Sequence, residues 1–183
     1  EKLIQLILAL KAEGIALRHL DLGGGIGIRY TNEEPIDPVV LFNEVFARLE
    51  RAGLGHLELV LEPGRSLVGN AGVLLTEVQY LKHSEAKNFA IVDAAMNDLL
   101  RPTLYDAWHS VEPVNPRPIT DATPTYDIVG PICESGDWLA RDRRLEVHQG
   151  DLLAIMSAGA YAFTMASQYN SRPRPAEIMV DGN

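Results

Sequence analysis

The sequence predicts an α/β region followed by a mostly β region, and three observations predict this division. Residues 1–65 alternate between helix-like and strand-like segments, the order that gives parallel strands joined by helices. The apolar run Leu57–Leu61 ends at Pro63-Gly64, as a short, nearly fully buried strand does, because proline cannot donate to a ladder. From Val73 the segments have mainly strand patterns. The change of architecture is therefore expected close to Gly72.

Composition limits the classes of function. The 183 residues are 46% hydrophobic, which is enough for one large domain or two small ones. A net charge of −9 argues against nucleic acid as a main partner. The sequence has no apolar run of the roughly 18 residues that a membrane span needs, and no signal-peptide pattern. The single cysteine excludes an internal disulfide framework and favours a reducing compartment, which we take to be the cytoplasm.

The α/β region is expected to run helix, strand, loop, helix, strand. A helix over residues 1–13 is followed by a strand over 17–22, which leads directly into a glycine-rich segment. Asp37 should cap a second helix that has Pro38 at its first position. The expected buried face of that helix is Val39, Phe42, Val45, Phe46 and Leu49. Because two strands cannot close a sheet, this region should belong to a larger α/β unit.

The β region is expected to contain short strands separated by turns. The strands are predicted at residues 73–81, 88–92, 145–147, 152–156 and 178–180. Gln149-Gly150-Asp151 is a turn signal. Residues 101–127 carry five prolines and should form a long irregular excursion that could serve as a binding loop. Residues 157–170 are rich in small residues and should hold a short helix.

The segment Gly23-Gly24-Gly25-Ile26-Gly27 follows a predicted strand and offers backbone N–H groups without side chains in the way. Such a nest binds phosphate, although a simple tight turn explains the glycines equally well. No Gly-Lys-Ser/Thr follows, so the segment is not a P-loop, and it is not a convincing dinucleotide fingerprint. The next strand ends at Glu62, Gly64 and Arg65. These charges could form a simple ion pair, or they could hold a cofactor.

Further candidates lie in the β region. Taken alone, Arg101 is more simply interpreted as part of an exposed Arg-Pro pair, and Tyr105 follows it at a spacing of four. Cys133 and Glu134 could be a buried cysteine beside a surface acid, but the flanking glycines and prolines favour an exposed functional loop. The histidines, His19, His56, His83, His109 and His148, lack metal-ligand spacing. We interpret them as solvated or structural and predict no metal site.

Five segments resemble the carboxy-terminal part of diaminopimelate decarboxylase, in the fold-type III pyridoxal-phosphate family that also contains eukaryotic ornithine decarboxylase. In chain order they are Gly23–Gly27, Glu62–Arg65, Ala95–Tyr105, Gly130–Asp137 and Ala158–Asn170. They occur in the family's order and span nearly the whole chain. The form Cys-Glu-Ser-Gly-Asp is similar to the diaminopimelate branch, because the ornithine branch typically has Cys-Asp in that loop.

The resemblance implies a fold and a reaction. Residues 1–70 would be the terminal part of a cofactor-binding (β/α)8 barrel, and residues 71–183 a β-barrel or sandwich domain that carries substrate and dimer-interface loops. The complete chain would decarboxylate meso-2,6-diaminopimelate to L-lysine and CO2, the last step of lysine biosynthesis, with pyridoxal 5'-phosphate as cofactor. A related decarboxylase of another diamino acid and a non-catalytic, partner-binding relative are the alternatives.

The resemblance also implies a role for each candidate. The cofactor contacts would be Gly23, Gly24, Gly25, Gly27, Glu62, Gly64, Arg65 and Tyr161, with Glu62 on the pyridinium nitrogen. Arg101 and Tyr105 would clamp the distal carboxylate of the substrate, with Arg65 also near it. Cys133 would supply the proton after CO2 leaves, and Glu134 would take the distal ammonium group. Cys133 and Glu134 would reach into the partner's site of a homodimer.

One departure from the family pattern is important. The family's Schiff-base lysine and the histidine that stacks on its ring lie earlier in the barrel, and this sequence has no matching lysine context. We therefore expect the 183 residues to be a fragment that is inactive alone, with the lysine upstream of Glu1.

Overall fold

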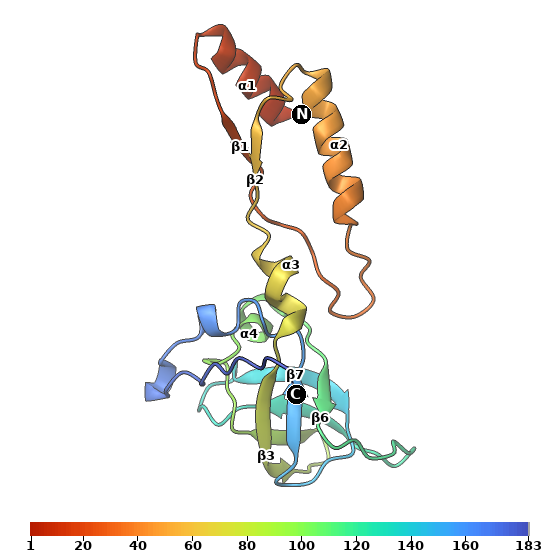
Figure 1. Cartoon of the computed structure of the whole chain (residues 1–183). Coiled ribbons are helices and arrows are strands. Elements are labelled where there is room, and N and C mark those ends of the chain that lie inside the picture. Colours follow the sequence, from red (N-terminus) through yellow and green to blue (C-terminus); the bar gives the residue numbers. More distant parts are fainter. Residues whose placement is uncertain (183) are drawn as a thin grey trace. The chain divides into compact units, whose positions relative to one another are not determined.

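The computed structural model describes residues 1–182, and these residues form two compact units (Figure 1). The first unit contains residues 1–27 and 34–66. The second contains residues 28–33 and the chain from Leu67 onward. The short segment 28–33 therefore belongs to the second unit, although it lies early in the sequence.

The first unit is a parallel pair of strands packed with two helices. Its elements are α1 (Lys2–Ala12), β1 (His19–Asp21), α2 (Pro38–Arg51) and β2 (Glu58–Val60). Leu20 of β1 faces Leu59 of β2 in parallel register, which confirms the predicted helix–strand order. The core of this unit consists of Ile7, Leu20, Leu49, Leu54 and Leu57. Helix α3 (Gly64–Val68) follows β2.

Local sequence signals set the start of α2. The Asp37 side chain accepts a hydrogen bond from the Val39 N–H at 2.8 Å, and Pro38 is the first helical residue, as predicted. The predicted buried face is wrong in part, because Val39 and Phe46 are 65% and 53% exposed. Strand β2 is also less buried than predicted, with both end residues exposed. A pair of strands covers only part of each helix, so much of the apolar surface of this unit stays open.

The second unit is built on one six-stranded sheet with the order β5-β8-β3-β4-β6-β7. Its strands are β3 (Leu74–Lys82), β4 (Asn88–Val92), β5 (Val111–Pro113), β6 (Thr125–Val129), β7 (Trp138–Arg144) and β8 (Leu152–Ile155). Strands β4 and β6 pair in parallel, and the other pairs are antiparallel. The core contains Val78, Leu99, Ile128, Leu139 and Leu153, each with no exposed surface. The predicted α/β-plus-β class is confirmed.

The β region differs from the prediction in three places. The proline-rich span 101–127 is not one irregular excursion, because it contains α4 (Arg101–Tyr105), β5 and the start of β6. Strand β7 was not predicted, and Leu145 and Val147 after it are buried without being part of a strand. Residues 178–180 lie outside any strand and are at least 82% exposed. The short helix predicted within 157–170 is present as the 3-10 turn η2 (Phe163–Met165), and the start of another, η3 (Tyr169–Ser171), follows it.

Two of these errors have the same physical cause. Strand β7 pairs with β6 but carries the charged run Arg141-Asp142-Arg143-Arg144, so its sequence lacks the apolar alternation that predicts a strand. Residues 178–180 have the opposite problem, because their sequence is apolar but no neighbouring strand pairs with them. Pairing with another strand, or its absence, decides both outcomes, and the local sequence pattern does not report it.

Candidate functional site

The glycine-rich loop of the first unit lies directly against the end of β2. Beyond the parallel pair, the Leu22 N–H donates to the Val60 carbonyl at 3.0 Å and the Glu62 N–H donates to the Gly23 carbonyl at 2.9 Å. A Cβ on Gly24 would lie 2.4 Å from the Glu62 carbonyl oxygen, so only glycine fits there. The structure therefore brings together the glycine loop and Glu62, as the order of strands predicted.

Most backbone N–H groups of this loop are not used by acceptors within the described protein. Gly23 and Gly25 have φ of +70° and +87°, the left-handed region that favours glycine. Within residues 1–182, the N–H groups of Gly24, Gly25 and Gly27 donate no hydrogen bond to protein. Open N–H groups in a loop of this kind form a concave site for an anion. The Glu62 side chain is exposed, and Gly64 and Arg65 follow it at the start of α3.

In the second unit, Arg101 is buried, which corrects the interpretation of an exposed Arg-Pro pair. Arg101 is 9% exposed and Pro102 is fully buried. The guanidinium Nη1 lies 3.0 Å from Nε2 of His109, and its central carbon lies 4.7 Å from the centroid of the Tyr30 ring. Arg101 starts helix α4, and Tyr105 lies one turn later with 64% of its surface exposed.

His109 was not predicted as a site residue, yet it is the buried partner of Arg101. It has no exposed surface, and its Nδ1 lies 2.9 Å from the Met156 carbonyl. Burial, together with the charges of Arg101 and Arg143, holds the pKa of His109 below its usual value, against the opposing effect of the Met156 carbonyl. No local motif marks this histidine, because its partners come from different elements.

The loop that carries Cys133 is exposed, as the flanking glycines and prolines predicted, which rules out the alternative of a buried cysteine. Glu134 shapes this loop with its own carboxylate, which accepts from the Gly136 N–H at 3.1 Å and the Ser135 hydroxyl at 3.3 Å. Tyr169 Oη lies 3.5 Å from the other carboxylate oxygen. These contacts, the Gly136 N–H first, hold the pKa of Glu134 below its usual range, so Glu134 is an anion at neutral pH.

Asp137 connects the cysteine loop to the segment that leads into α4. Its two carboxylate oxygens accept from the N–H groups of Met96 and Ile132, both at 2.7 Å. Burial raises the pKa of Asp137 in spite of these bonds. Thr103, on α4, adds a second connection by donating to the Gly136 carbonyl at 2.5 Å. Only the family resemblance predicts that the two segments share a site, and in the structure Asp137 and Thr103 join them.

Tyr161 follows a close contact between two glycine backbones. A Cβ on Gly159 would lie 1.8 Å from the Val68 carbonyl oxygen, and a Cβ on Gly72 would lie 2.5 Å from the Gly159 Cα. Tyr161 itself has φ of +62° and is 39% exposed. Only glycines allow the two backbone segments to approach this closely.

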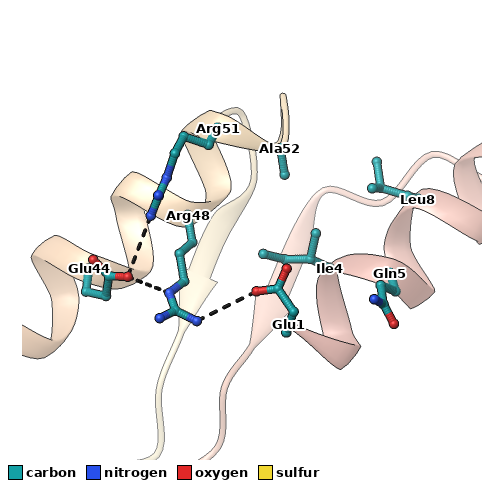
Figure 2. A pocket seen from close by; sticks show the side chains of 8 residues that line it. All are labelled: Glu1, Ile4, Gln5, Leu8, Glu44, Arg48, Arg51 and Ala52. Carbon is teal, nitrogen blue, oxygen red and sulfur yellow. Dashed lines mark hydrogen bonds and ion pairs between the residues drawn. The ribbon is translucent and has the colours of Figure 1, made fainter.

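Two hollows differ in their relation to these residues. A hollow of about 530 Å³ lies between α1 and α2, and none of the predicted site residues lines it (Figure 2). Its charges are already paired, with Arg48 contacting Glu44 at 2.6 Å and Glu1 at 3.7 Å. A hollow of about 370 Å³ in the second unit is lined by Glu134 and Asp137. The smaller hollow is therefore the one beside the candidate chemistry.

Residues 1–182 lack two features. In this part of the chain, no helix has the length and apolar character to cross a membrane. The same residues contain no group of three histidine, cysteine, aspartate or glutamate side chains arranged to hold a metal ion.

Comparison with known proteins identifies the family. A diaminopimelate decarboxylase from Pseudomonas aeruginosa is 58% identical over all of this chain, and the match covers 43% of that relative. A crystal structure from Aquifex aeolicus matches 98% of this chain and 44% of its own, with 46% identity and a TM-score of 0.89. The Helicobacter pylori diaminopimelate decarboxylase structure with L-lysine matches 94% of this chain and 42% of its own, with 45% identity and a TM-score of 0.82.

The extent of these matches decides what they establish. The chain spans less than half the length of the curated relatives. The family described as "Pyridoxal-dependent decarboxylase, C-terminal sheet domain" matches residues 17–159, which is most of the chain. The chain therefore belongs to the pyridoxal-dependent decarboxylase family.

Proposed function

We propose that the protein containing this chain is a pyridoxal-phosphate-dependent carboxy-lyase that converts meso-2,6-diaminopimelate to L-lysine and CO2. The observation that carries the proposal is the conjunction of a buried arginine with an exposed Cys-Glu pair on a loop tied to it. The relatives named diaminopimelate decarboxylase, 56% and 58% identical over the whole chain, support it. The reaction would be the last step of lysine biosynthesis.

The residues of the first unit fit a phosphorylated, nitrogen-containing cofactor. The open N–H groups of the Gly23–Gly27 loop suit a phosphate, and a Cβ at Gly24 would fill the space against Glu62. Glu62 would face the pyridinium nitrogen, and Gly64 and Arg65 would complete the contacts from this unit. Tyr161, on the second unit, is proposed as a further contact of the cofactor phosphate. Pyridoxal phosphate, when bound, accepts the electron pair that stays behind as CO2 departs.

The residues of the second unit suit a substrate with an amino and a carboxyl group at each end. Arg101, with Tyr105, would bind the distal carboxylate by charge-assisted hydrogen bonds, and the family resemblance gives Arg65 of the first unit a role toward the same substrate. Glu134, an anion at neutral pH, would bind the distal ammonium group. The Cys133 thiol would then deliver a proton from Sγ to the carbon that has lost CO2.

The proposal extends to organisation. Residues 1–70 would be the end of a (β/α)8 barrel and residues 71–183 the β domain. The exposed position of Cys133 and Glu134 supports a homodimer in which each subunit supplies this loop to its partner's site. A cytoplasmic location agrees with a single, unpaired cysteine.

The test is decarboxylation by the complete protein with pyridoxal phosphate. We expect release of CO2 and L-lysine from meso-diaminopimelate and much slower release of CO2 from ornithine, because ornithine leaves the buried Arg101 charge unpaired. Preference for ornithine, or binding of cofactor without any decarboxylation, would contradict the proposal.

A further inference from the structure

Arg101 is a buried cation that pairs with no carboxylate in the described part of the chain. Within residues 1–182, none of the ion pairs includes Arg101, although the residue is 9% exposed. Burying an unpaired charge is costly, so such a group normally has an anion to bind. The one hydrogen-bond contact that the described residues give its guanidinium is Nε2 of His109, at 3.0 Å.

The contact with Arg101 fixes the protonation of His109. A guanidinium has five N–H donors and no acceptor, so Nε2 of His109 must accept the hydrogen bond. The ring proton then lies on Nδ1, which donates to the Met156 carbonyl at 2.9 Å. A doubly protonated ring would point an N–H at the Arg101 guanidinium. The ring is therefore neutral and leaves the positive charge of Arg101 available.

The other groups around the ring agree with a neutral histidine. Tyr30 packs edge-on against the ring, with centroids 5.4 Å apart, and its face also covers the Arg101 guanidinium. Arg143 donates to the His109 carbonyl at 3.1 Å, so a second positive charge lies close by. No carboxylate of residues 1–182 pairs with the ring.

We propose that His109 is a positioning residue, whose neutral Nε2 orients the Arg101 guanidinium toward the distal carboxylate of the substrate. The inference rests on the proposed function, in which Arg101 binds that carboxylate. An arginine side chain has many rotamers, and a contact at one nitrogen together with the Tyr30 face removes most of this freedom before substrate arrives. A lysine or a protonated histidine at position 109 could not accept from Arg101.

Two amide variants of the complete enzyme separate the two ring contacts. His109→Gln keeps an acceptor near the Nε2 position and loses the donor to Met156. His109→Asn keeps a donor near the Nδ1 position and loses the acceptor for Arg101. Both remove one hydrogen bond from the same buried site, so each is the structural control for the other.

L-Lysine and cadaverine, tested as inhibitors, provide a readout that a merely structural role would not change. The two compounds differ by one carboxylate, the group that Arg101 would bind. His109→Asn should weaken inhibition by lysine about 10- to 100-fold, with a similar rise in KM for diaminopimelate. The Ki of cadaverine for His109→Asn should stay within about twofold of the wild-type value. His109→Gln should retain most of the wild-type affinity for lysine.

The outcomes distinguish the inference from the proposed function. If the wild-type enzyme decarboxylates diaminopimelate but the two variants lose lysine affinity equally, or neither loses it, His109 does not position Arg101. If the wild-type enzyme does not decarboxylate diaminopimelate, the proposed function itself fails. Should a variant not fold, nitrogen-15 NMR of histidine in the wild-type enzyme remains decisive. A neutral ring protonated on Nδ1 is expected, and a proton on Nε2 would overturn the inference.

Discussion

Arg101 and Cys133 lie on two segments of the same unit that are held in opposite ways. Arg101 is 9% exposed and is fixed by side chains, His109 at its nitrogen and Tyr30 at its face. Cys133 and Glu134 are exposed, and backbone N–H groups hold their loop. The difference indicates that the Arg101 guanidinium is already positioned for recognition, whereas the side chains of Cys133 and Glu134 face solvent.

The two segments are nevertheless tied to each other. Thr103 of α4 donates to the Gly136 carbonyl, and Asp137 accepts from the backbone on both sides. A shift of one segment should therefore move the other. Variants of each segment can show whether recognition and proton delivery are separate functions of this unit.

The largest effect should come from the cysteine loop. We expect Cys133→Ala in the complete enzyme to lower kcat by about 100-fold or more, because a positioned general acid contributes about that much. Mixing this variant with a second inactive variant, which lacks the Schiff-base lysine proposed upstream, should restore about a quarter of wild-type activity. Random exchange puts about half of the subunits into mixed dimers, each with one complete site.

The control for the mixing experiment is subunit exchange itself, measured with two differently tagged wild-type chains. If exchange is complete and mixing restores no activity, the thiol and the lysine come from the same chain. The exposed position of Cys133 would then need another explanation than a shared site.

Arg101→Ala should have the next largest effect. Loss of a charge-assisted contact in a closed site should raise the free energy of the transition state by about 2–4 kcal/mol, measured as kcat/KM for diaminopimelate. Cofactor affinity should change little. Arg144→Ala is the matched control, since its side chain is 47% exposed and it pairs loosely with Asp121. A value of kcat/KM for Arg101→Ala within about twofold of wild type would exclude the clamp.

Arg101 and Cys133 also show which site residues could be predicted from the sequence. Arg101 and Cys133 were found because family motifs preserve their neighbours in sequence. His109, Tyr30 and Asp137 were missed, because each acts across the fold. Tyr30 lies on a segment that the sequence assigns to the α/β region but that packs in the second unit.

The elements were predictable where local chemistry decides them and not elsewhere. The cap at Asp37 and the strand β4 follow from side chains within a few residues. The charged strand β7 depends on its pairing with β6. The helix that begins at Arg101 depends on a partner more than 30 residues away, Gly136 for Thr103. Periodicity carries no information on such partners.

Asp137→Asn should lower stability and affect both segments. An amide can accept from only one of the two N–H groups, so the other is left facing an NH2 group inside the protein. We expect the free energy of unfolding to fall by about 1–3 kcal/mol, measured by urea denaturation. Asp142→Asn is the control, because its side chain is 74% exposed. Equal stability of the two variants would show that Asp137 does not hold the loops together.

Gly24→Ala tests the first unit in the same way. Its Cβ would meet the Glu62 carbonyl at 2.4 Å, so the loop must shift, whereas a Cβ on Gly27 meets nothing within 4 Å. We expect Gly24→Ala to destabilise the complete enzyme by about 1–3 kcal/mol. Gly27→Ala should change its stability by less than about 0.5 kcal/mol in the same thermal unfolding experiment. If the two variants melt together, the close approach of the loop to Glu62 is not required.

The smallest expected effect is on the pH dependence of stability, and it involves Asp151, which lies outside both segments. Asp151 lies between the turn at Gln149-Gly150 and β8, the strand that leads to the Met156 carbonyl behind His109. Arg117, which donates two hydrogen bonds to the Asp151 carboxylate, and the His148 N–H hold the pKa of Asp151 below its usual value. A lowered pKa means that Asp151 stabilises the folded protein above the unfolded pKa of about 3.9. This contribution is lost as pH falls through the lower, folded pKa.

Because the Arg117 side chain is 36% exposed, solvent screens the pair, and the contribution should be about 1 kcal/mol or less. We expect Asp151→Asn to reduce stability at pH 7 and to make stability less dependent on pH below about 4. Urea denaturation at pH 3, 4 and 7 measures both changes. The Ki of lysine at pH 7 should not change, because the variant keeps β8 and the Met156 carbonyl. A rise in that Ki would mean that the turn at Asp151 and the position of Arg101 are coupled through β8, so that stability and recognition are not separable in this unit.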